Sequence, residues 1–252
     1  MLFRSRTFLR ALTVAAALAA CGAAAAADAP VKAVIELFTS QGCHSCPPAD
    51  RLAGRLAERD GIVMLSLPVD YWDYLGWHDT LAESAFSARQ RAYARARGDR
   101  HIYTPQMVVN GLDDVVGSDV MAIADAIEHT DADKRVLCMP LTVSQAGGRI
   151  VVSVPSRPGF AGEVVLAAFA RHRTVTIGAG ENAQSRVTYT NVVRKLTPLG
   201  RWTGAAASFA VDRATAMPSD ADDFVALLQA ENDSLPGPIL GVARAPERAA
   251  RQ

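Results

Sequence analysis

Two cysteines separated by two residues, Cys43 and Cys46, are the residues of this chain best suited to chemistry. An apolar run over residues 31–38 precedes them, and residues 49–56 follow with the apolar spacing of a helix. The pair therefore lies where a strand passes into a helix. The first turn of a helix has free N–H groups and the positive end of the helix dipole, and both stabilise a thiolate. A Cys-x-x-Cys pair in this position is typical of thiol–disulfide redox chemistry.

The two cysteines are expected to have different roles. Cys43 precedes the helix and is the candidate nucleophile, because the first cysteine of such a pair is normally the more exposed. Cys46, one turn on, would resolve the mixed disulfide. His44 lies between them, where a cationic imidazole would stabilise the Cys43 thiolate and make the disulfide more oxidising. The alternatives are a solvated loop histidine and, for the pair, half of a zinc site or two structural cysteines.

The first 27 residues have the features of an export signal. Three arginines form a basic leader, and Ala11–Ala20 is an apolar stretch too short to span a membrane. Cleavage after Ala27 would suit an ordinary signal peptidase. Alternatively, Leu18–Cys21 resembles a bacterial lipobox, which would end the signal at residue 20 and make Cys21 a lipidated first residue. Both routes predict a periplasmic or secreted protein, whose link to a membrane would be the lipid on Cys21.

Charge and cysteine content narrow the possible functions. The chain has 26 basic and 26 acidic side chains, so there is no electrostatic argument for nucleic acid binding. About 220 residues remain after export, enough for one large domain or two small ones. The four cysteines are too few for a disulfide scaffold. If Cys43 pairs with Cys46, Cys138 is left over and is expected to be buried and inert.

Residues 31–135 are expected to form an α/β domain. Continuous apolar runs such as residues 62–69 are typical of strands buried on both faces. Residues 81–97 predict a helix that buries a face rich in alanine and exposes its arginines. Asn110-Gly111 predicts a hairpin turn, and Ser118 can cap the last helix. The expected order is β-α-β-α-β-β-α, over residues 31–38, 46–59, 62–69, 81–97, 106–110, 112–117 and a helix that contains residues 120–127.

Residues 141–244 are expected to form a mostly antiparallel β-sandwich domain. Beyond residues 136–140 the pattern changes to short apolar strands separated by turn signals. Residues 222–229 fit either helix or strand, and residues 245–252 are expected to be a frayed tail. The expected strands cover residues 141–145, 149–154, 163–170, 174–177, 186–189, 191–196, 207–211 and 239–243.

The first half resembles the thioredoxin fold, because its element order places Cys-x-x-Cys between the first strand and the first helix. Thr104-Pro105 precedes the third expected strand, where thioredoxin-like proteins carry a cis-proline that faces the cysteines. The alternative is a trans proline that opens a strand. The resemblance also implies a carboxylate buried beneath the cysteines for proton transfer. Glu36 is the candidate for it, and a salt-bridged or edge glutamate is the alternative.

Three phrases make the resemblance more specific: IELFTSQGC at residues 35–43, VDYWDYLGW at 69–77 and YTPQMVVNG at 103–111. They are similar to a family of secreted bacterial proteins, catalogued as domain of unknown function 1223 and given a thioredoxin-like fold. The similarity runs from Val31 nearly to the C-terminus, and it implies fold and export but no established reaction. Gly42 stands where thioredoxins usually have a tryptophan. The aromatic side chains of residues 71–77 would wall a substrate groove or pack in a core or domain interface.

Metal handling is an alternative to redox chemistry. Two thiolates with a nearby histidine suit a soft ion such as Cu(I). Some exported thioredoxin-like proteins use a cysteine pair and a distant histidine as a copper chaperone. Here His78 and His101 are the candidate third ligands beside Cys43 and Cys46. A structural zinc site would need four ligands.

The sequence therefore predicts an exported thiol–disulfide oxidoreductase with a thioredoxin-like domain and a β-sandwich domain. Its substrates would be exported or envelope proteins, and the cysteines themselves would carry the electrons, so no organic cofactor is expected. A copper chaperone and a non-catalytic interaction protein with a structural disulfide are the alternatives.

Overall fold

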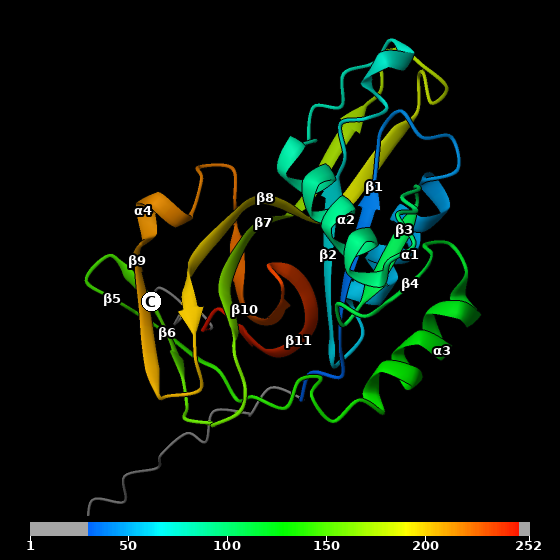
Figure 1. Ribbon diagram of the computed structural model, residues 1–252. Coiled ribbons are helices and arrows are strands. Elements are labelled where there is room, and N and C mark those ends of the chain that lie inside the picture. The colour runs from blue at the N-terminus through cyan, green and yellow to red at the C-terminus, as the bar shows by residue number, and fades with distance from the viewer. Residues whose placement is uncertain (1–29, 247–252) are drawn as a thin grey trace, which may run out of the picture.

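The computed structural model describes residues 30–246 of the chain (Figure 1). The expected export signal, Cys21 and most of the expected tail lie outside these residues. Within residues 30–246, no helix is both long enough and apolar enough to cross a membrane.

The first half alternates strands and helices. β1 and β2 are buried along their whole length, in agreement with their continuous apolar runs. α2 begins at Ser84 and not at residue 81, because Asp79 holds the preceding residues in a turn and accepts the N–H of Leu81 at 2.9 Å. The elements are β1 (Ala33–Thr39), α1 (Pro47–Ala57), β2 (Ile62–Pro68), the 3₁₀ helix η1 (Asp73–Leu75), α2 (Ser84–Arg97), β3 (Gln106–Val109), β4 (Asp113–Val116) and α3 (Val120–Asp131).

The second half consists mainly of strands, two of which are longer than expected. β7 and β8 continue through residues 171–173 and residue 190, where the sequence predicted breaks, and local irregularities occur near both positions. The β7–β8 register shifts between Ala168 and Phe169, and Asn191 has a φ of 47°. Residues 223–232 are strand, and the short helix α4 was not expected. The elements are β5 (Thr142–Ala146), β6 (Arg149–Val154), β7 (Gly162–Thr176), β8 (Arg186–Trp202), β9 (Ala207–Asp212), α4 (Arg213–Ala216), β10 (Asp223–Asn232) and β11 (Leu235–Arg244).

One eight-stranded sheet contains strands from both halves, in the order β11-β10-β7-β8-β2-β1-β3-β4 (Figure 1). β2 and β8 run parallel where the halves meet, with Ser66 paired to Val192. Ser66 Oγ strengthens this junction, because it donates a hydrogen bond to the carbonyl of Thr190 at 2.8 Å. Four strands of the second half thus extend the sheet of the first. The expected thioredoxin-like domain and its boundary remain predictions.

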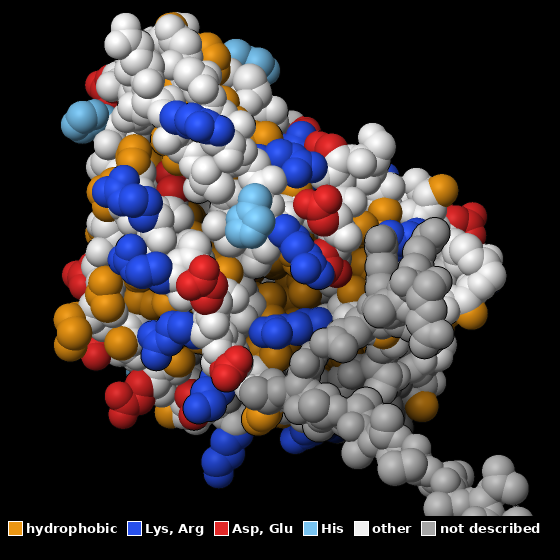
Figure 2. Space-filling view, turned by 180° about the vertical axis from the view of Figure 1, so that it is seen from behind, with side chains coloured by type: hydrophobic (Ala, Val, Ile, Leu, Met, Phe, Trp, Pro, Cys, Tyr) orange, Lys and Arg blue, Asp and Glu red, His pale blue; other side chains and the backbone are white. Residues whose placement is uncertain are grey.

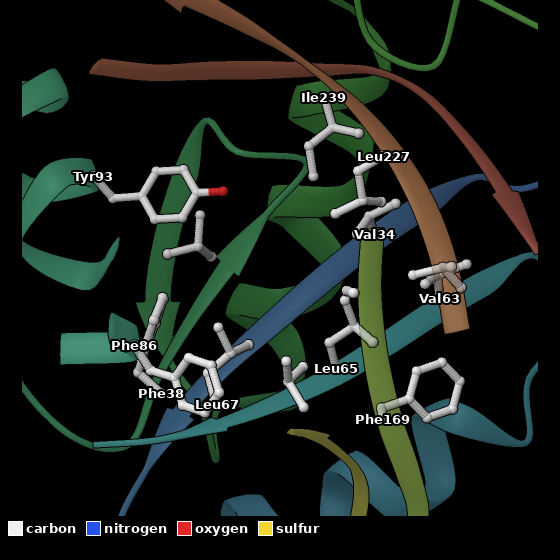
Figure 3. Close-up of a cluster of buried hydrophobic side chains, with 14 of the residues drawn as sticks. Val34, Phe38, Val63, Leu65, Leu67, Phe86, Tyr93, Phe169, Leu227 and Ile239 are labelled. Atoms are coloured by element: carbon white, nitrogen blue, oxygen red, sulfur yellow. The ribbon is translucent and has the colours of Figure 1, made fainter. Parts of the chain in front are cut away.

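Helices cover both faces of the sheet in the first half. Alternate residues of a strand point to opposite faces, so Ile35 packs against α1 and α3 while Phe38 packs against α2. The core on the α2 side continues into β7, β10 and β11, as Figure 3 shows with Phe169, Leu227 and Ile239. The two halves therefore share one apolar core.

A second, three-stranded sheet of order β5-β6-β9 packs on the strands of the second half. Val152 of β6 belongs to the same buried cluster as Val164 of β7 and Leu228 of β10. Alternate residues of β6 are buried, as expected of a strand with one face on a core. The strands of this second sheet do not cover the β4 edge of the large sheet or the end of α1 that carries the cysteines (Figure 1).

Candidate functional site

Cys43 and Cys46 form a disulfide at the N-terminus of α1, with their Cα atoms 5.4 Å apart. Cys46 is the N-cap residue of this helix, and its carbonyl accepts the N–H groups of Ala49 and Asp50. Pro47 stands in the first turn, where an N–H would have no helical partner. The free N–H groups and positive dipole end of α1 therefore lie next to the sulfur atoms, where they would stabilise a thiolate after reduction.

Both cysteines are buried in this disulfide-bonded state. Cys43 is 1% exposed and Cys46 is 0% exposed, whereas His44 and Ser45 between them are exposed. The expectation that Cys43 is the more exposed of the two does not hold here, because other parts of the chain lie on its loop. One of them is the segment after β2: a Cβ at Gly42 would lie 3.0 Å from the Cβ of Trp72.

The turn between β7 and β8 also lies on the cysteine loop. Asn182 in this turn is buried, and its side-chain amide donates hydrogen bonds to the carbonyls of Gln41 at 2.9 Å and Cys43 at 2.8 Å. Figure 1 shows the tip of the β7–β8 hairpin close to the segment that contains η1. A residue of the second half, 139 positions away in sequence, thus fixes the backbone of the candidate nucleophile.

Trp77, in the aromatic stretch after β2, also contacts the cysteine loop. Trp77 donates its indole N–H to Gln41 Oε1 at 2.7 Å. It also packs against Gly178 of the β7–β8 turn, where a Cβ would lie 2.7 Å from the ring. Tyr74 differs from the tryptophans, because it is 78% exposed. The aromatic stretch was expected either to wall a substrate groove or to pack in a core or domain interface. Trp77 packs between the two halves, whereas Tyr74 is open to solvent.

Thr104 and Pro105 lie beside the disulfide and are joined by a cis peptide bond. Ser45 connects them to the cysteines: its hydroxyl oxygen is 3.5 Å from Cys43 Sγ and 3.4 Å from the carbonyl oxygen of Thr104. Trp72 fixes Thr104 from another side, because its Nε1 donates to Thr104 Oγ1 at 2.8 Å. The structure thus gathers the cysteines, Thr104 and Pro105, together with Ser45, a residue that sequence reasoning did not single out.

Glu36 lies elsewhere, in a buried ion pair on the α2 face of the sheet. Arg89 Nε and Nη2 donate to its carboxylate at 2.6 and 3.0 Å, and the hydroxyl of Tyr93 donates to it as well. Gln229 of β10 bonds to both Arg89 and Tyr93 at 2.8 Å. Glu36 was expected beneath the cysteines. It points instead to the face of the sheet that α2 covers, whereas α1, which carries the cysteines, packs on the opposite face. Glu36 is therefore a salt-bridged glutamate, which was the alternative interpretation.

Asp50 is the buried carboxylate on the cysteine side, one helical turn after Cys46. It is 3% exposed and accepts a hydrogen bond from Thr39 Oγ1 at 2.7 Å. Burial raises the pKa of Asp50 from 3.8 to about 7, although the Thr39 bond opposes the shift and nearby Asp79 adds to it. Asp79 is buried too, and burial raises its pKa although the N–H of Gln41 donates to it. Sequence reasoning missed this acidic pair.

The family model for proteins of unknown function, DUF1223, matches residues 34–229. The chain belongs to this family. The crystal structure of a protein from Agrobacterium tumefaciens is similar, with 33% identity, a TM-score of 0.78, and coverage of 90% of this chain and 100% of that one. HBP35 of Porphyromonas gingivalis shares the fold at 12% identity and a TM-score of 0.55, with 89% and 80% of the two chains covered. A search of curated proteins finds no match.

These comparisons confirm the family that the three sequence phrases indicated. The thioredoxin-like fold and the export that the resemblance implied remain predictions for this DUF1223 protein. The matched region ends at Gln229, so it includes both the disulfide loop and Asn182. The family match therefore covers the contacts between the two halves at the candidate site.

The two histidines proposed as metal ligands do not join the cysteines. His78 is exposed and its Nδ1 lies 2.5 Å from Asp73 Oδ2. His101 is exposed in the loop after α2, where its N–H donates to Asp99 at 2.9 Å. Over residues 30–246, no three His, Cys, Asp or Glu side chains are grouped so that they could hold a metal ion.

An exposed apolar patch lies next to Pro105. The N–H of Gly117 donates to the carbonyl of Pro105 at 2.9 Å, and a Cβ at Gly117 would lie 3.2 Å from the Pro105 ring. On either side of this glycine, Val116, Val120 and Met121 are exposed large hydrophobic residues.

A cavity of about 620 Å³ lies between α1, β2 and β8. Figure 2 shows a hollow on this side of the molecule, with an apolar floor and charged side chains around it. The lining includes Phe169 and Phe224, the charged residues Arg51 and Arg244, and Asp50. The cavity therefore reaches the buried acid of the site, but the two cysteines are not part of its lining.

Proposed function

We propose that this protein is an exported thiol–disulfide oxidoreductase, with Cys43–Cys46 as its redox centre and residues 31–135 as a thioredoxin-like domain. One observation carries the proposal: the disulfide closes at the N-terminus of α1, with Thr104-Pro105 beside it. Helix-end electrostatics favour a thiolate there, and a stabilised thiolate makes a disulfide easier to reduce. The substrates are exported or envelope proteins.

The reaction proceeds by two thiolate attacks. A thiolate of the partner attacks Cys43 Sγ, the Cys43–Cys46 bond breaks, and Cys46 leaves with the electron pair as a thiolate. A second partner thiolate then attacks the mixed disulfide, so that the partner becomes oxidised and Cys43 is released reduced. With a disulfide-bonded partner the same steps run in reverse. The chain needs no organic cofactor, because the two sulfur atoms accept the two electrons.

Asp50 and the apolar patch support this chemistry. Cys46 needs a proton when it leaves, and Asp50, with a pKa of about 7 one turn away, holds one at neutral pH and below. The cavity that Asp50 lines gives this acid a route to solvent. The exposed side chains of Val116, Val120 and Met121 suit an apolar segment of a partner near the disulfide.

The deciding experiment is to trap partners in an extract of envelope proteins. In a chain with Cys138→Ser, the further change Cys46→Ser is expected to accumulate mixed disulfides at Cys43, because the resolving thiol is missing. Cys43→Ser is the matched control and is expected to trap few partners. A redox titration of the unaltered pair, with metal content measured on the same sample, completes the test.

A static structural disulfide is the second candidate, and the near-complete burial of both cysteines favours it. The protein would then be a non-catalytic interaction protein. This candidate predicts a very low reduction potential, slow alkylation of both thiols after forced reduction, and no trapped partner from either variant. That set of results would overturn the oxidoreductase proposal. The copper-chaperone alternative receives no support from the positions of His78 and His101.

A further inference from the structure

Ser45 places a hydroxyl group between a sulfur atom of the disulfide and a backbone carbonyl. Its Oγ is 3.5 Å from Cys43 Sγ and 3.4 Å from the carbonyl oxygen of Thr104. Ser45 is exposed, while Cys43 is almost fully buried. Ser45 is thus a solvent-exposed residue whose hydroxyl lies next to a buried sulfur atom.

The acceptors that flank this hydroxyl differ in strength between the two redox states. A hydroxyl has one proton to donate. In the disulfide, Cys43 Sγ is a weak acceptor, so the proton is directed to the carbonyl of Thr104. In the reduced protein, Cys43 Sγ as a thiolate carries a full charge and becomes the stronger acceptor, because hydrogen bonds to ionised groups are the stronger kind.

Hydrogen bonds from other parts of the chain hold the two residues that carry these acceptors. Trp72 Nε1 holds Thr104 through a hydrogen bond to its Oγ1 at 2.8 Å. Asn182 holds the carbonyl of Cys43 at 2.8 Å. With these two residues held, rotation of the Ser45 hydroxyl hydrogen exchanges one acceptor for the other.

We propose that Ser45 is a catalytic residue of the exchange reaction, whose hydroxyl donates a hydrogen bond to the Cys43 thiolate and returns to the Thr104 carbonyl when the disulfide closes. The proposal rests on the proposed oxidoreductase function and adds a residue to it. In the step itself, Cys43 Sγ gains the electron pair as the bond to the partner sulfur breaks. The Ser45 proton stays on its oxygen and only its hydrogen-bond acceptor changes.

The test measures the pKa of the Cys43 thiol without any partner protein. The exported chain, residues 28–252, carries Cys46→Ala and Cys138→Ser, so that Cys43 alone reacts with iodoacetamide across a series of pH values. Ser45→Ala is expected to raise the pKa of Cys43 by about one to two units, which is what one hydrogen bond to a charged group is worth. Ser45→Thr keeps a hydroxyl at this position and is expected to retain the original pKa.

Two further measurements make the result decisive. Thermal unfolding of the disulfide-bonded Ser45→Ala chain is expected to match the unaltered protein, which separates a thiolate effect from a loss of structure. A Cys43 pKa that is equal with serine, threonine and alanine at position 45 would overturn the role of Ser45, even if partners are trapped. A shift in the alanine variant that threonine reverses, found without trapped partners, supports the hydrogen bond and overturns only the exchange function.

Discussion

Replacement of Asp50 by asparagine tests whether the carboxyl group one turn after Cys46 is buried at a cost to its ionised form. The asparagine side chain has almost the same shape and can still accept the hydrogen bond that Thr39 Oγ1 donates at 2.7 Å. The change removes the ionisation of Asp50, whose folded pKa of about 7 lies well above its usual value of 3.8. The variant thus isolates the cost of ionising a carboxyl group at a site that is 3% exposed.

The sign of the effect follows from proton binding. Between the usual pKa of 3.8 and the folded pKa of about 7, the folded protein keeps the Asp50 proton while the unfolded chain has lost it. Stability contributed by this residue is therefore complete below pH 4 and falls as the pH rises to 7. The difference between the two pKa values corresponds to about 4 kcal/mol, at roughly 1.4 kcal/mol per pKa unit.

Urea unfolding of the disulfide-bonded protein at pH values from 4 to 8 measures this difference. Relative to the unaltered protein, Asp50→Asn is expected to gain stability as the pH rises, by up to about 4 kcal/mol between pH 4 and pH 8. Asp60→Asn, at an exposed aspartate just beyond α1, is the matched control and is expected to follow the unaltered protein. Parallel stability curves for Asp50→Asn and the unaltered protein would refute the argument from burial.

Three further outcomes are expected. Arg89→Ala leaves a buried carboxylate without its partner and is expected to lower the free energy of unfolding by about 3–5 kcal/mol, measured by urea unfolding; a loss below about 1 kcal/mol contradicts the ion-pair argument. Asn182→Ala removes two hydrogen bonds from the cysteine loop and is expected to speed reduction by dithiothreitol about tenfold, whereas exposed Glu181→Ala leaves the rate unchanged. Mass spectrometry of the exported protein is expected to find a start at Asp28 or a lipidated Cys21, and a mature chain that keeps Met1 contradicts export.

The strands of the first half were predictable because their apolar runs are continuous. Residues 31–38 and 62–69 were expected as buried strands, and β1 and β2 lie at Ala33–Thr39 and Ile62–Pro68. The buried face of α2 was not predicted correctly. The alanine-rich face was expected to be buried, but the helix buries Phe86, Gln90 and Tyr93, because the large aromatic side chains fill the core and alanine does not.

The residues of the candidate site were predictable in part. Cys-x-x-Cys was found from local pattern, and Thr104-Pro105 was found through the resemblance to thioredoxin-like proteins. Asp50 had a detectable signal, because a carboxylate four residues after Cys46 lies within the buried stripe of α1. Asn182 had none, since nothing local predicts that the β7–β8 turn reaches the cysteine loop.

The contacts between the halves imply that the first half does not fold by itself into the state described here. Without residues 136–252, the carbonyls of Gln41 and Cys43 lose the amide of Asn182, and Arg89 loses Gln229. The apolar core on the α2 side also loses Phe169, Leu227 and Ile239, each of which is buried. Removal of a large core side chain costs about 2–5 kcal/mol, so the loss of three is comparable to the whole stability of a typical domain, about 5–15 kcal/mol.

A shortened chain of residues 28–135 is therefore expected to show no cooperative thermal transition when it is monitored by circular dichroism. Dithiothreitol is expected to reduce its Cys43–Cys46 disulfide as fast as a disulfide in an unfolded peptide. The full exported chain, residues 28–252, is the matched control and is expected to melt in one transition, because the halves share a core. A cooperative melt of the shortened chain, with the slow reduction of the full chain, would contradict this conclusion. The β-rich half would then be a separate module, and the cover over the cysteine loop would be dispensable for its protection.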